Sequence, residues 1–346
     1  MHRFALPCVL ASFLAGCSSG SSGGEATASP GAGGAAGAGA GGSSSAGASG
    51  ASGASAAGAS GGTAFTCPAS ITPGYNQGFM AGDRARKFFA DFPSNTATPP
   101  AVVFSYHGFG DSADAWRTYM ALDPNTDPDF PFILITPDDL GLFPFNDPQG
   151  LGWAIFTGEA ASPNPEGDLF ETALACLTRD NQIDAKRVYI VGFSAGGILA
   201  NLMHMRYQAQ GKLAATASFS GAWFDDPAQT ATVHPLNFKV DYHWDALDPA
   251  RAGTILMAHG GPNDVFSTNG QQVIDFEQVA GLAIPFLGAA KRTVIDCKHT
   301  SGHAPPPGIH AKQVTAFFKA HKAGEPSPYL TAGVDPILPT SCALVQ

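Results

Sequence analysis

Residues 188–197 constrain the fold of this chain more than any other stretch, and they read Val-Tyr-Ile-Val-Gly-Phe-Ser-Ala-Gly-Gly. An apolar run typical of a buried strand ends at Gly192, and a helical pattern begins just after Ser194. A turn this tight leaves no room for side chains at its flanking positions, which explains Gly192 and Gly196. We therefore predict a strand, a sharp turn that presents Ser194, and a helix whose N-terminus favours negative charge beside that serine.

From residue 101 onward, short apolar runs alternate with helical patterns, which is typical of a parallel sheet wrapped by helices. The expected strands are Val102–Tyr106, Phe132–Thr136, Val188–Val191, Ala214–Phe219, Thr254–Ala258 and Thr293–Asp296. The expected helices are Asp168–Asp180 with Asp168 as its cap, Gly196–Gln210 and Ala311–Lys322, and Thr66–Phe92 should add antiparallel edge strands. Together with the turn at Ser194, the pattern predicts an α/β-hydrolase fold with a mostly parallel central sheet, formed by one catalytic domain over residues 65–346.

In such a fold Ser194 is a nucleophile, and its partners follow along the chain in the order Ser, acid, His. The acid should follow the strand after next, where Thr254–Ala258 leads into a loop that contains Asp264. We predict Asp264 as the acid, because Asp275 lies in a helical pattern and Asp245 lies in an insertion. A loop carboxylate that caps the next segment is the alternative role for Asp264.

The histidine should lie in the loop after the last parallel strand, and this loop holds both His299 and His303. We predict His303 as the base, because Gly302 before it permits a sharp turn and a helix follows; His299 is then a rim histidine. His259 should pack or hydrogen-bond locally. These histidines have no carboxylate or thiolate cluster at metal-ligand spacing, so we expect no metal, and the chemistry implies no cofactor.

Two backbone N–H groups should hold the carbonyl oxygen of a substrate. One belongs to Ala195, directly after the serine. The other should come from the Gly-rich loop His107–Gly110, with Phe109 or Gly108 as the donor.

Aromatic residues near these elements either wall an apolar pocket or pack in the core. The pocket candidates are Trp153, Phe193 and Trp223. The segment Ala222–Ala252, rich in Asp, Pro, His and aromatic residues, is expected to be an insertion between strands and a candidate lid.

From about Val102 to Lys322 the chain resembles the polyhydroxybutyrate-depolymerase-like esterases, a group that includes many bacterial and fungal feruloyl and acetylxylan esterases. The matching stretches are His107–Gly110, Trp153, Asp168, Ile183–Tyr189 leading into Gly192–Gly197, His259–Val265 and Gly302–His303. The resemblance implies Ser194 as nucleophile, Asp264 as acid and His303 as base. Extracellular polymer depolymerases usually append a binding module, whereas about 24 residues follow the last expected helix here, so adsorption to a solid polymer is not expected.

These features predict a serine carboxylic-ester hydrolase that works through an acyl-enzyme. The expected substrates are soluble short-chain, feruloyl- or acetyl-type, or hydroxyalkanoate-oligomer esters. Two alternatives come from other classes: an exported peptidase or acyltransferase with the same triad, and a surface binding protein that keeps the fold without turnover.

The first 16 residues are typical of an export signal. Arg3 precedes a short apolar stretch, Phe4 to Leu14, which is too short to span a bilayer as a permanent helix. Leu14-Ala15-Gly16-Cys17 resembles the bacterial lipobox, in which the cysteine is lipidated. We therefore expect a lipid anchor at Cys17 in the bacterial cell envelope, with Ser18 favouring the outer membrane; an ordinary secretory signal cleaved near Gly16 is the alternative.

Residues 17–64 are nearly all Gly, Ala and Ser, so they cannot bury enough apolar surface to fold and are expected to form a flexible linker. Four cysteines follow this linker: Cys67, Cys176, Cys297 and Cys342. An even number in an exported domain predicts two disulfides, with three possible connectivities and free buried thiols as the alternative.

The chain carries 18 basic and 28 acidic residues, a net charge of −10, without a cluster of Lys and Arg. Binding to a phosphate backbone needs a basic surface, so nucleic acid is not an expected partner. The acidic balance is expected to keep the domain soluble.

Overall fold

The computed structural model describes residues 65–94, 97–142, 152–155, 164–208, 210–221, 250, 253–268 and 271–345. The chain divides into two units, residues 1–61 and 62–346, and all of the described residues belong to the second. The expected signal segment, the linker with Cys17, and all of Ala222–Ala252 except Ala250 lie outside the described residues. Within the described part, no helix is long and apolar enough to cross a membrane.

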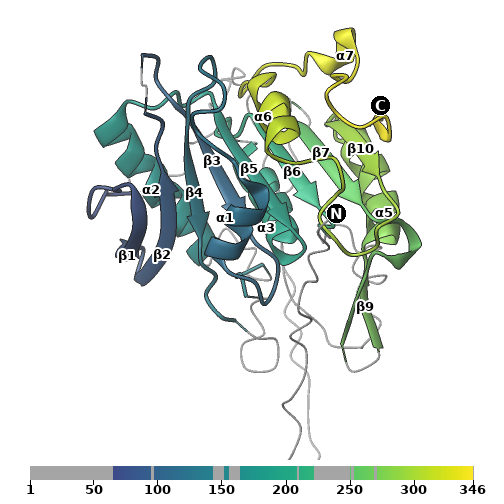
Figure 1. Ribbon diagram of the computed structural model, residues 1–346, viewed down its shortest axis with the longest axis horizontal. Helices are drawn as coiled ribbons and strands as arrows, with labels where there is room; N and C mark the ends of the chain where they lie inside the picture. The colour runs from purple at the N-terminus through teal and green to yellow at the C-terminus, as the bar shows by residue number, and fades with distance from the viewer. Residues whose placement is uncertain are drawn as a thin grey trace, which may run out of the picture. The chain divides into compact units, whose positions relative to one another are not determined.

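A nine-stranded sheet forms the centre of this second unit, in the order β1-β2-β4-β3-β5-β6-β7-β10-β11 (Figure 1). Its strands are β1 (Gly74–Ala81), β2 (Arg84–Asp91), β3 (Ala101–Tyr106), β4 (Phe132–Pro137), β5 (Val188–Phe193), β6 (Ala215–Phe219), β7 (Thr254–His259), β10 (Thr293–Lys298) and β11 (Cys342–Val345). The inner strands β3 to β7 and β10 pair in parallel, while β1 and β2 at one edge and β11 at the other are antiparallel to their neighbours. The predicted parallel strands and the antiparallel edge are therefore confirmed.

Strand β3 lies between β4 and β5. The chain therefore adds β4 on one side of β3 and then crosses over to add β5 on the other side. At this point the carboxyl ends of β3 and β5 lie side by side, with Tyr106 paired in register with Gly192. Open α/β sheets bind their ligands at such a reversal of strand order. The topology thus brings the Gly-rich loop after β3 beside the turn that carries Ser194.

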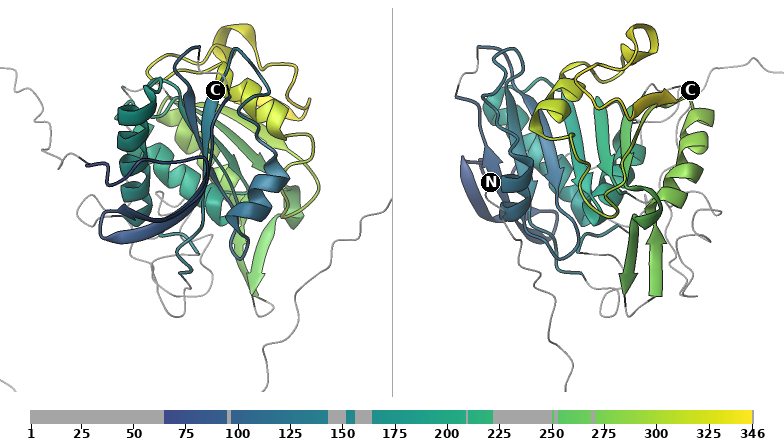
Figure 2. Two further views of the ribbon diagram at one scale, coloured as in Figure 1. Left: turned by 60° about the vertical axis from the view of Figure 1, so that its left-hand side comes forward. Right: turned by 45° about the vertical axis from the view of Figure 1, so that its right-hand side comes forward.

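Helices cover both faces of the sheet, as predicted (Figures 1 and 2). Apolar side chains of α2, α3 and α5 pack in one core cluster, and those of α1, α6 and α7 pack in a second cluster across the sheet. The helices are α1 (Ala113–Met120), α2 (Pro165–Asn181), α3 (Ala195–Gln208), α5 (Phe276–Ala289), α6 (Ala311–Lys319) and α7 (Tyr329–Ala332), with a short 3₁₀ turn η1 (Gly261–Asn263). In α3, which follows the serine turn, nearly every side chain is buried.

Three local features differ from the sequence-based expectations. Helix α2 begins three residues before Asp168 and is capped by Asn164, whose side chain accepts from the backbone N–H groups of Glu166 and Gly167. The predicted cap at Asp168 is therefore wrong, because Pro165 at the first position already favours a helix start there. A second, two-stranded sheet was not expected: β8 (Val265–Thr268) and β9 (Gln271–Asp275) form an antiparallel hairpin that stands out from the domain (Figure 2). The third feature is β11, whose short sequence carries no strong strand pattern.

Both predicted disulfides are present, and the structure gives their connectivity. Cys67 pairs with Cys176 and ties the segment before β1 to α2. Cys297 pairs with Cys342, its partner in the β10–β11 register, so this bond lies across the edge of the main sheet.

Helix α3 also contains a fully buried histidine, His204, whose Nδ1 lies 3.0 Å from the hydroxyl of Thr216 on β6. Burial, with a smaller contribution from the positive charge of Arg292, lowers the pKa of His204 from 6.5 to about 3. The folded protein therefore binds this proton less readily than the unfolded chain does. Above pH 6.5 this difference does not lower the free energy of unfolding. As the pH falls from 6.5 toward 3, the free energy of unfolding decreases by up to about 1.4 kcal/mol per pH unit.

We predict that His204→Gln reduces the pH dependence of folding, since glutamine does not titrate. The free energy of unfolding of the wild type should fall by about 2 kcal/mol more than that of the variant between pH 7 and pH 5. Urea unfolding at the two pH values, with the disulfides intact, measures this difference. An identical fall in both proteins would contradict a neutral buried His204.

Candidate active site

Ser194 lies in a turn between β5 and α3, and the two glycine positions that flank this turn have no space for a side chain. A Cβ at Gly192 would lie 2.1 Å from the carbonyl oxygen of Gly196, and a Cβ at Gly196 would lie 2.3 Å from that of Tyr106. Ser194 itself has φ +54°, a left-handed conformation that is uncommon for residues with a side chain. Its N–H donates to the carbonyl of Phe219 at 2.8 Å, and its own carbonyl accepts from Ile198 at 2.9 Å, so the strained residue is held from both sides.

The structure brings Ser194, His303 and Asp264 together from three separate loops. Nε2 of His303 lies 2.9 Å from the hydroxyl oxygen of Ser194, and Nδ1 of His303 lies 2.7 Å from Oδ1 of Asp264. The serine is 8% exposed, the histidine side chain 21%, and the aspartate is fully buried. Solvent can therefore reach the serine and the histidine, while the carboxylate is held out of water behind them.

The second oxygen of Asp264 is held by two donors that the sequence did not reveal. The hydroxyl of Ser220 donates to Oδ2 at 2.8 Å, and the backbone N–H of Gly260 donates at 2.7 Å. Ser220 follows β6 directly and has φ +45°, so it is a second non-glycine residue in the left-handed region near the site. A buried carboxylate is costly unless it is hydrogen-bonded, and here both of its oxygens have partners.

Two phenylalanines face the ring of His303. Phe276, the first residue of α5, stacks on the imidazole with ring centroids 4.6 Å apart and planes 13° apart. Phe193, the residue before Ser194, faces the imidazole at 5.0 Å and 30°. The backbone N–H of Phe276 donates to the carbonyl of Asp264 at 2.9 Å, which fixes Phe276 beside the acid and closes the base of the β8–β9 hairpin.

The Gly-rich loop after β3 lies against the serine. A Cβ at Gly108 would lie 3.3 Å from the Cβ of Ser194, so the loop and Ser194 are in close contact. The carbonyl of Gly108 accepts from the ring Nδ1 of His107, at 2.8 Å, and from the backbone N–H of Asp111, at 3.2 Å. The carbonyl of His107 accepts from the indole N–H of Trp153 at 2.9 Å. The peptide units that follow His107 and Gly108 are thereby held in a set orientation.

The proposed pocket residues have different positions in the structure. Trp153 is completely buried, packs edge-on against Tyr106 and supports the loop from below, so its predicted place in a pocket wall is wrong. The indole N–H is the reason, because it needs a buried acceptor and the carbonyl of His107 supplies one. Phe193 is partly exposed beside Ser194. Trp223 lies outside the described residues.

His299 and His259 form no hydrogen bond with the hydroxyl of Ser194 or with the carboxylate of Asp264. Nε2 of His259 lies 3.2 Å from Oδ1 of Asp296, and the backbone N–H of His299 donates to the carbonyl of His259 at 3.0 Å. Burial lowers the pKa of His299, opposed by the charge of Asp264. Among the described residues, no group of three or more His, Cys, Asp and Glu side chains is placed to hold a metal ion.

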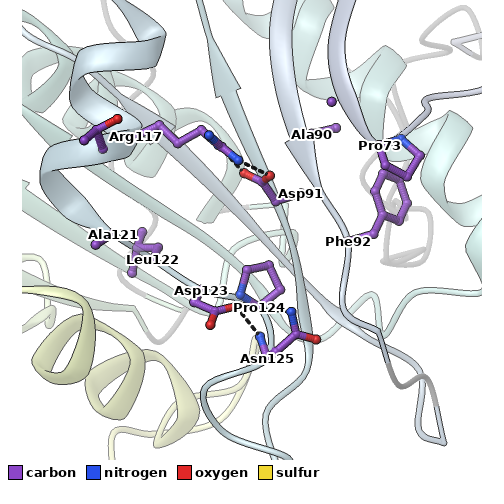
Figure 3. Close-up of a pocket in the computed structure, with 12 residues that line it drawn as sticks. Pro73, Ala90, Asp91, Phe92, Arg117, Ala121, Leu122, Asp123, Pro124 and Asn125 are labelled. Carbon is purple, nitrogen blue, oxygen red and sulfur yellow. Dashed lines mark hydrogen bonds and ion pairs between the residues drawn. The ribbon is translucent and has the colours of Figure 1, made fainter.

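A separate hollow of about 500 Å³ lies near the ends of β2 and α1 (Figure 3). The ion pair between Asp91 and Arg117 lies on one side of it, and Asn125 donates to Asp123 on another. Ser194, Asp264 and His303 do not line this hollow, so it is distinct from the site at Ser194.

The arrangement at Ser194 can transfer a proton and stabilise the charge that results. A serine hydroxyl in hydrogen-bond contact with an imidazole can lose its proton as the oxygen attacks, and a carboxylate on the far ring nitrogen stabilises the imidazolium. The backbone N–H of Ala195 belongs to the first turn of α3, where amide groups have no acceptor within the helix. That amide can serve a developing negative charge next to the serine.

No protein-family model matches the chain. The chain aligns with "Feruloyl esterase B" of Neurospora crassa at 31% identity over 156 residues, which are 44% of this chain and 49% of the relative. It thus spans about half the length of this curated relative.

Solved structures named pOPH and sOPH are similar over most of the chain. A pOPH variant bound to DMSO has a TM-score of 0.62 at 18% identity and covers 82% of this chain and 96% of its own. Native pOPH has a TM-score of 0.61 at 19% identity, with 81% and 97% covered. Native sOPH has a TM-score of 0.59 at 17% identity, with 82% and 97% covered. At these identities the similarity shows a shared fold.

We predict that Ser220→Ala lowers kcat by about 5- to 30-fold, because a buried oxygen of Asp264 loses one of its two donors. KM should change less than twofold, since Ser220 lies behind the acid. The strain at φ +45° is similar for Ser and Ala, so the substitution isolates the hydroxyl. Steady-state kinetics on a chromogenic ester measures both constants.

The matched control is Ser218→Ala in β6, two residues before Ser220, which removes a buried hydroxyl that donates to the carbonyl of Gly197. This variant should lose stability but keep kcat within about twofold. Equal losses of kcat in the two variants would mean that Ser220 acts through packing alone.

Proposed function

We propose that this chain, which has the α/β-hydrolase fold, is a serine carboxylic-ester hydrolase. One observation carries the proposal: an unbroken chain of hydrogen bonds joins the hydroxyl of Ser194, both ring nitrogens of His303 and the buried Asp264. The order of the three residues along the chain is the order that this fold uses. The similarity of nearly half of the chain to a feruloyl esterase supports ester hydrolysis over other reactions of the fold.

In the proposed mechanism, Nε2 of His303 accepts the proton of Ser194 as the serine oxygen attacks the ester carbonyl. Asp264 keeps the ring in the tautomer that accepts at Nε2 and stabilises the imidazolium. The imidazolium then gives its proton to the leaving alkoxide, and an acyl-enzyme remains on Ser194. A water molecule loses a proton to His303 as its oxygen attacks the acyl carbon. The imidazolium then returns that proton to the oxygen of Ser194 as the bond between this oxygen and the acyl carbon breaks, which releases the acid and restores the serine hydroxyl.

The oxyanion is held in this proposal by the backbone N–H groups of Ala195 and Phe109. Both donors of the Gly108 carbonyl, the ring of His107 and the N–H of Asp111, turn that oxygen to one side. In a trans peptide the N–H of the next residue points the opposite way, so the Phe109 amide is directed away from these groups. The contact between Gly108 and Ser194 brings this peptide unit within reach of an oxygen on the attacked carbon.

The proposed substrates are soluble short-chain, feruloyl- or acetyl-type, or hydroxyalkanoate-oligomer esters. The partly exposed ring of Phe193 beside the nucleophile supports an apolar or aromatic acyl group. Turnover of a panel of these four ester types identifies the preferred class. Labelling by a fluorophosphonate probe separates an active enzyme from a binding protein with an inert site, and hydrolysis of peptides in place of esters would contradict the assignment.

We predict that Ser194→Ala lowers kcat/KM on a short-chain p-nitrophenyl ester by at least 10³-fold, since triad members of serine hydrolases cost about 10⁴- to 10⁶-fold. His303→Ala should be comparably severe because the serine loses its base. His299→Ala is the matched control from the same loop and should change kcat/KM less than about threefold. The opposite order of the two histidines would assign the base to His299.

We further propose that the protein is exported and anchored to the bacterial envelope through a lipid on Cys17. The two disulfides support an oxidising compartment, where such bonds persist. The lipobox-like residues Leu14 to Cys17 support the anchor.

We predict that Cys17→Ser abolishes the incorporation of radiolabelled fatty acid when the chain is produced in a bacterium that processes lipoproteins. Cys8→Ser, inside the expected signal segment, is the control and should leave labelling intact. A labelled Cys17→Ser protein would show that the lipid, if any, is attached elsewhere.

A further inference from the structure

The imidazole of His303 belongs to a row of five stacked or nearly stacked rings. In order, these rings belong to Tyr119, Trp116, Phe193, His303 and Phe276. Successive centroids are 5.7, 6.1, 5.0 and 4.6 Å apart, and the interplanar angles are 13°, 20°, 30° and 13°. The row starts on the exposed face of α1 and ends at the first residue of α5.

Both phenylalanines that face the imidazole are themselves fixed. Phe193 is backed by Trp116, whose indole N–H donates to the hydroxyl of Ser105 at 2.9 Å. Phe276 is buried, and its backbone N–H is bound to the carbonyl of Asp264. The two rings therefore restrict the imidazole on both faces, whereas Ser194 and Asp264 hold it only at its edge.

The faces of an aromatic ring carry partial negative charge and attract a cation placed above them. His303 is neutral at rest in the proposed mechanism and becomes an imidazolium each time an oxygen attacks the carbonyl carbon. A ring on each face stabilises the charged state more than the neutral one, and in a partly desolvated site this attraction is stronger than in water.

We propose that Phe276 and Phe193 are positioning residues that hold the imidazole of His303 in line and stabilise its protonated form during turnover. This inference rests on the proposed function, and it assigns to both phenylalanines a part in the rate of the chemical steps. It predicts that loss of the buried Phe276 ring weakens the base without weakening the binding of the ester.

In the part of the chain that the structure describes, the segments around His303 carry other charged and titratable groups, and a substitution at either phenylalanine leaves these groups in place. They are Asp264 after β7, Asp275 and Glu277 at the start of α5, His299 and Lys298 on the segment that leads to His303, and His107 and Asp111 on the loop after β3. A change in the pH profile therefore reports on the rings and not on a neighbouring charge.

The test is Phe276→Leu, which keeps an apolar side chain of similar volume and removes the ring. Rates are divided by the concentration of sites titrated with a fluorophosphonate probe, so that misfolded protein does not count. We expect kcat to fall about 3- to 30-fold, with KM within twofold. The acidic limb of the plot of kcat/KM against pH should shift to lower pH by about half to one unit, because the imidazolium is less stable without the ring. Phe276→Tyr keeps the ring and should restore most of kcat and the position of the limb.

The matched control is Phe317→Leu in α6, where a buried phenylalanine ring lies 4.8 Å from the ring of His321, outside the site. It should lower stability but leave kcat and the pH profile unchanged. If Phe276→Leu cannot be folded, Phe193→Leu removes the ring on the opposite face and should give the same shift in the acidic limb. The proposal would be overturned if an active variant, titrated with the probe, kept the acidic limb of its kcat/KM profile at the wild-type pH and kept kcat within twofold. The proposed function itself would be overturned if the wild type neither hydrolysed esters nor reacted with the probe.

Discussion

The lack of space between β5 and α3 is the constraint on which the site depends. Carbonyl oxygens occupy the positions where a Cβ at Gly192 or Gly196 would lie, so only glycine allows the helix to approach the sheet this closely. Ser194 is consequently held in a left-handed conformation with its hydroxyl facing the loop that follows β10. The same closeness brings the carbonyls of Tyr106 and His107 against α3, so the loop after β3 lies directly beside the turn that carries Ser194.

A second constraint is the buried charge of Asp264. Its oxygens need partners, and these come from the end of β6, the turn after β7 and the loop after β10. Because the parallel strands end at the same edge of the sheet, these segments meet without long connections. Satisfying the carboxylate therefore aligns the histidine, and the hydrogen bond from Phe276 to the backbone of Asp264 attaches α5 and the hairpin to the same point.

The sequence was informative wherever one local pattern decides the geometry. The apolar runs predicted the parallel strands, the glycines around Ser194 predicted the turn, and chain order selected Asp264 and His303, which the structure brings to Ser194. It was uninformative where the contact depends on a residue distant in sequence. Ser220 has no motif, and its role depends on the register of β6 beside β7; the place of Trp153 depends on a carbonyl 46 residues earlier in the chain. The left-handed backbone of Ser220, directly after a buried strand, marks this residue locally. That conformation is a property of the structure and cannot be read from the sequence.

The Cys297–Cys342 bond joins the edge strand β11 to β10, and the loop that carries His303 departs from β10. Lys298, the last residue of β10, donates its backbone N–H to the carbonyl of Ser341, so the disulfide and β11 together brace the start of that loop. Opening the bond would free β11 and loosen this support, and the imidazole would lose its alignment with the serine. A thiol reductant would then inhibit the proposed serine hydrolase without reacting at Ser194, and such inhibition would be evidence about the edge of the sheet rather than about a cysteine nucleophile.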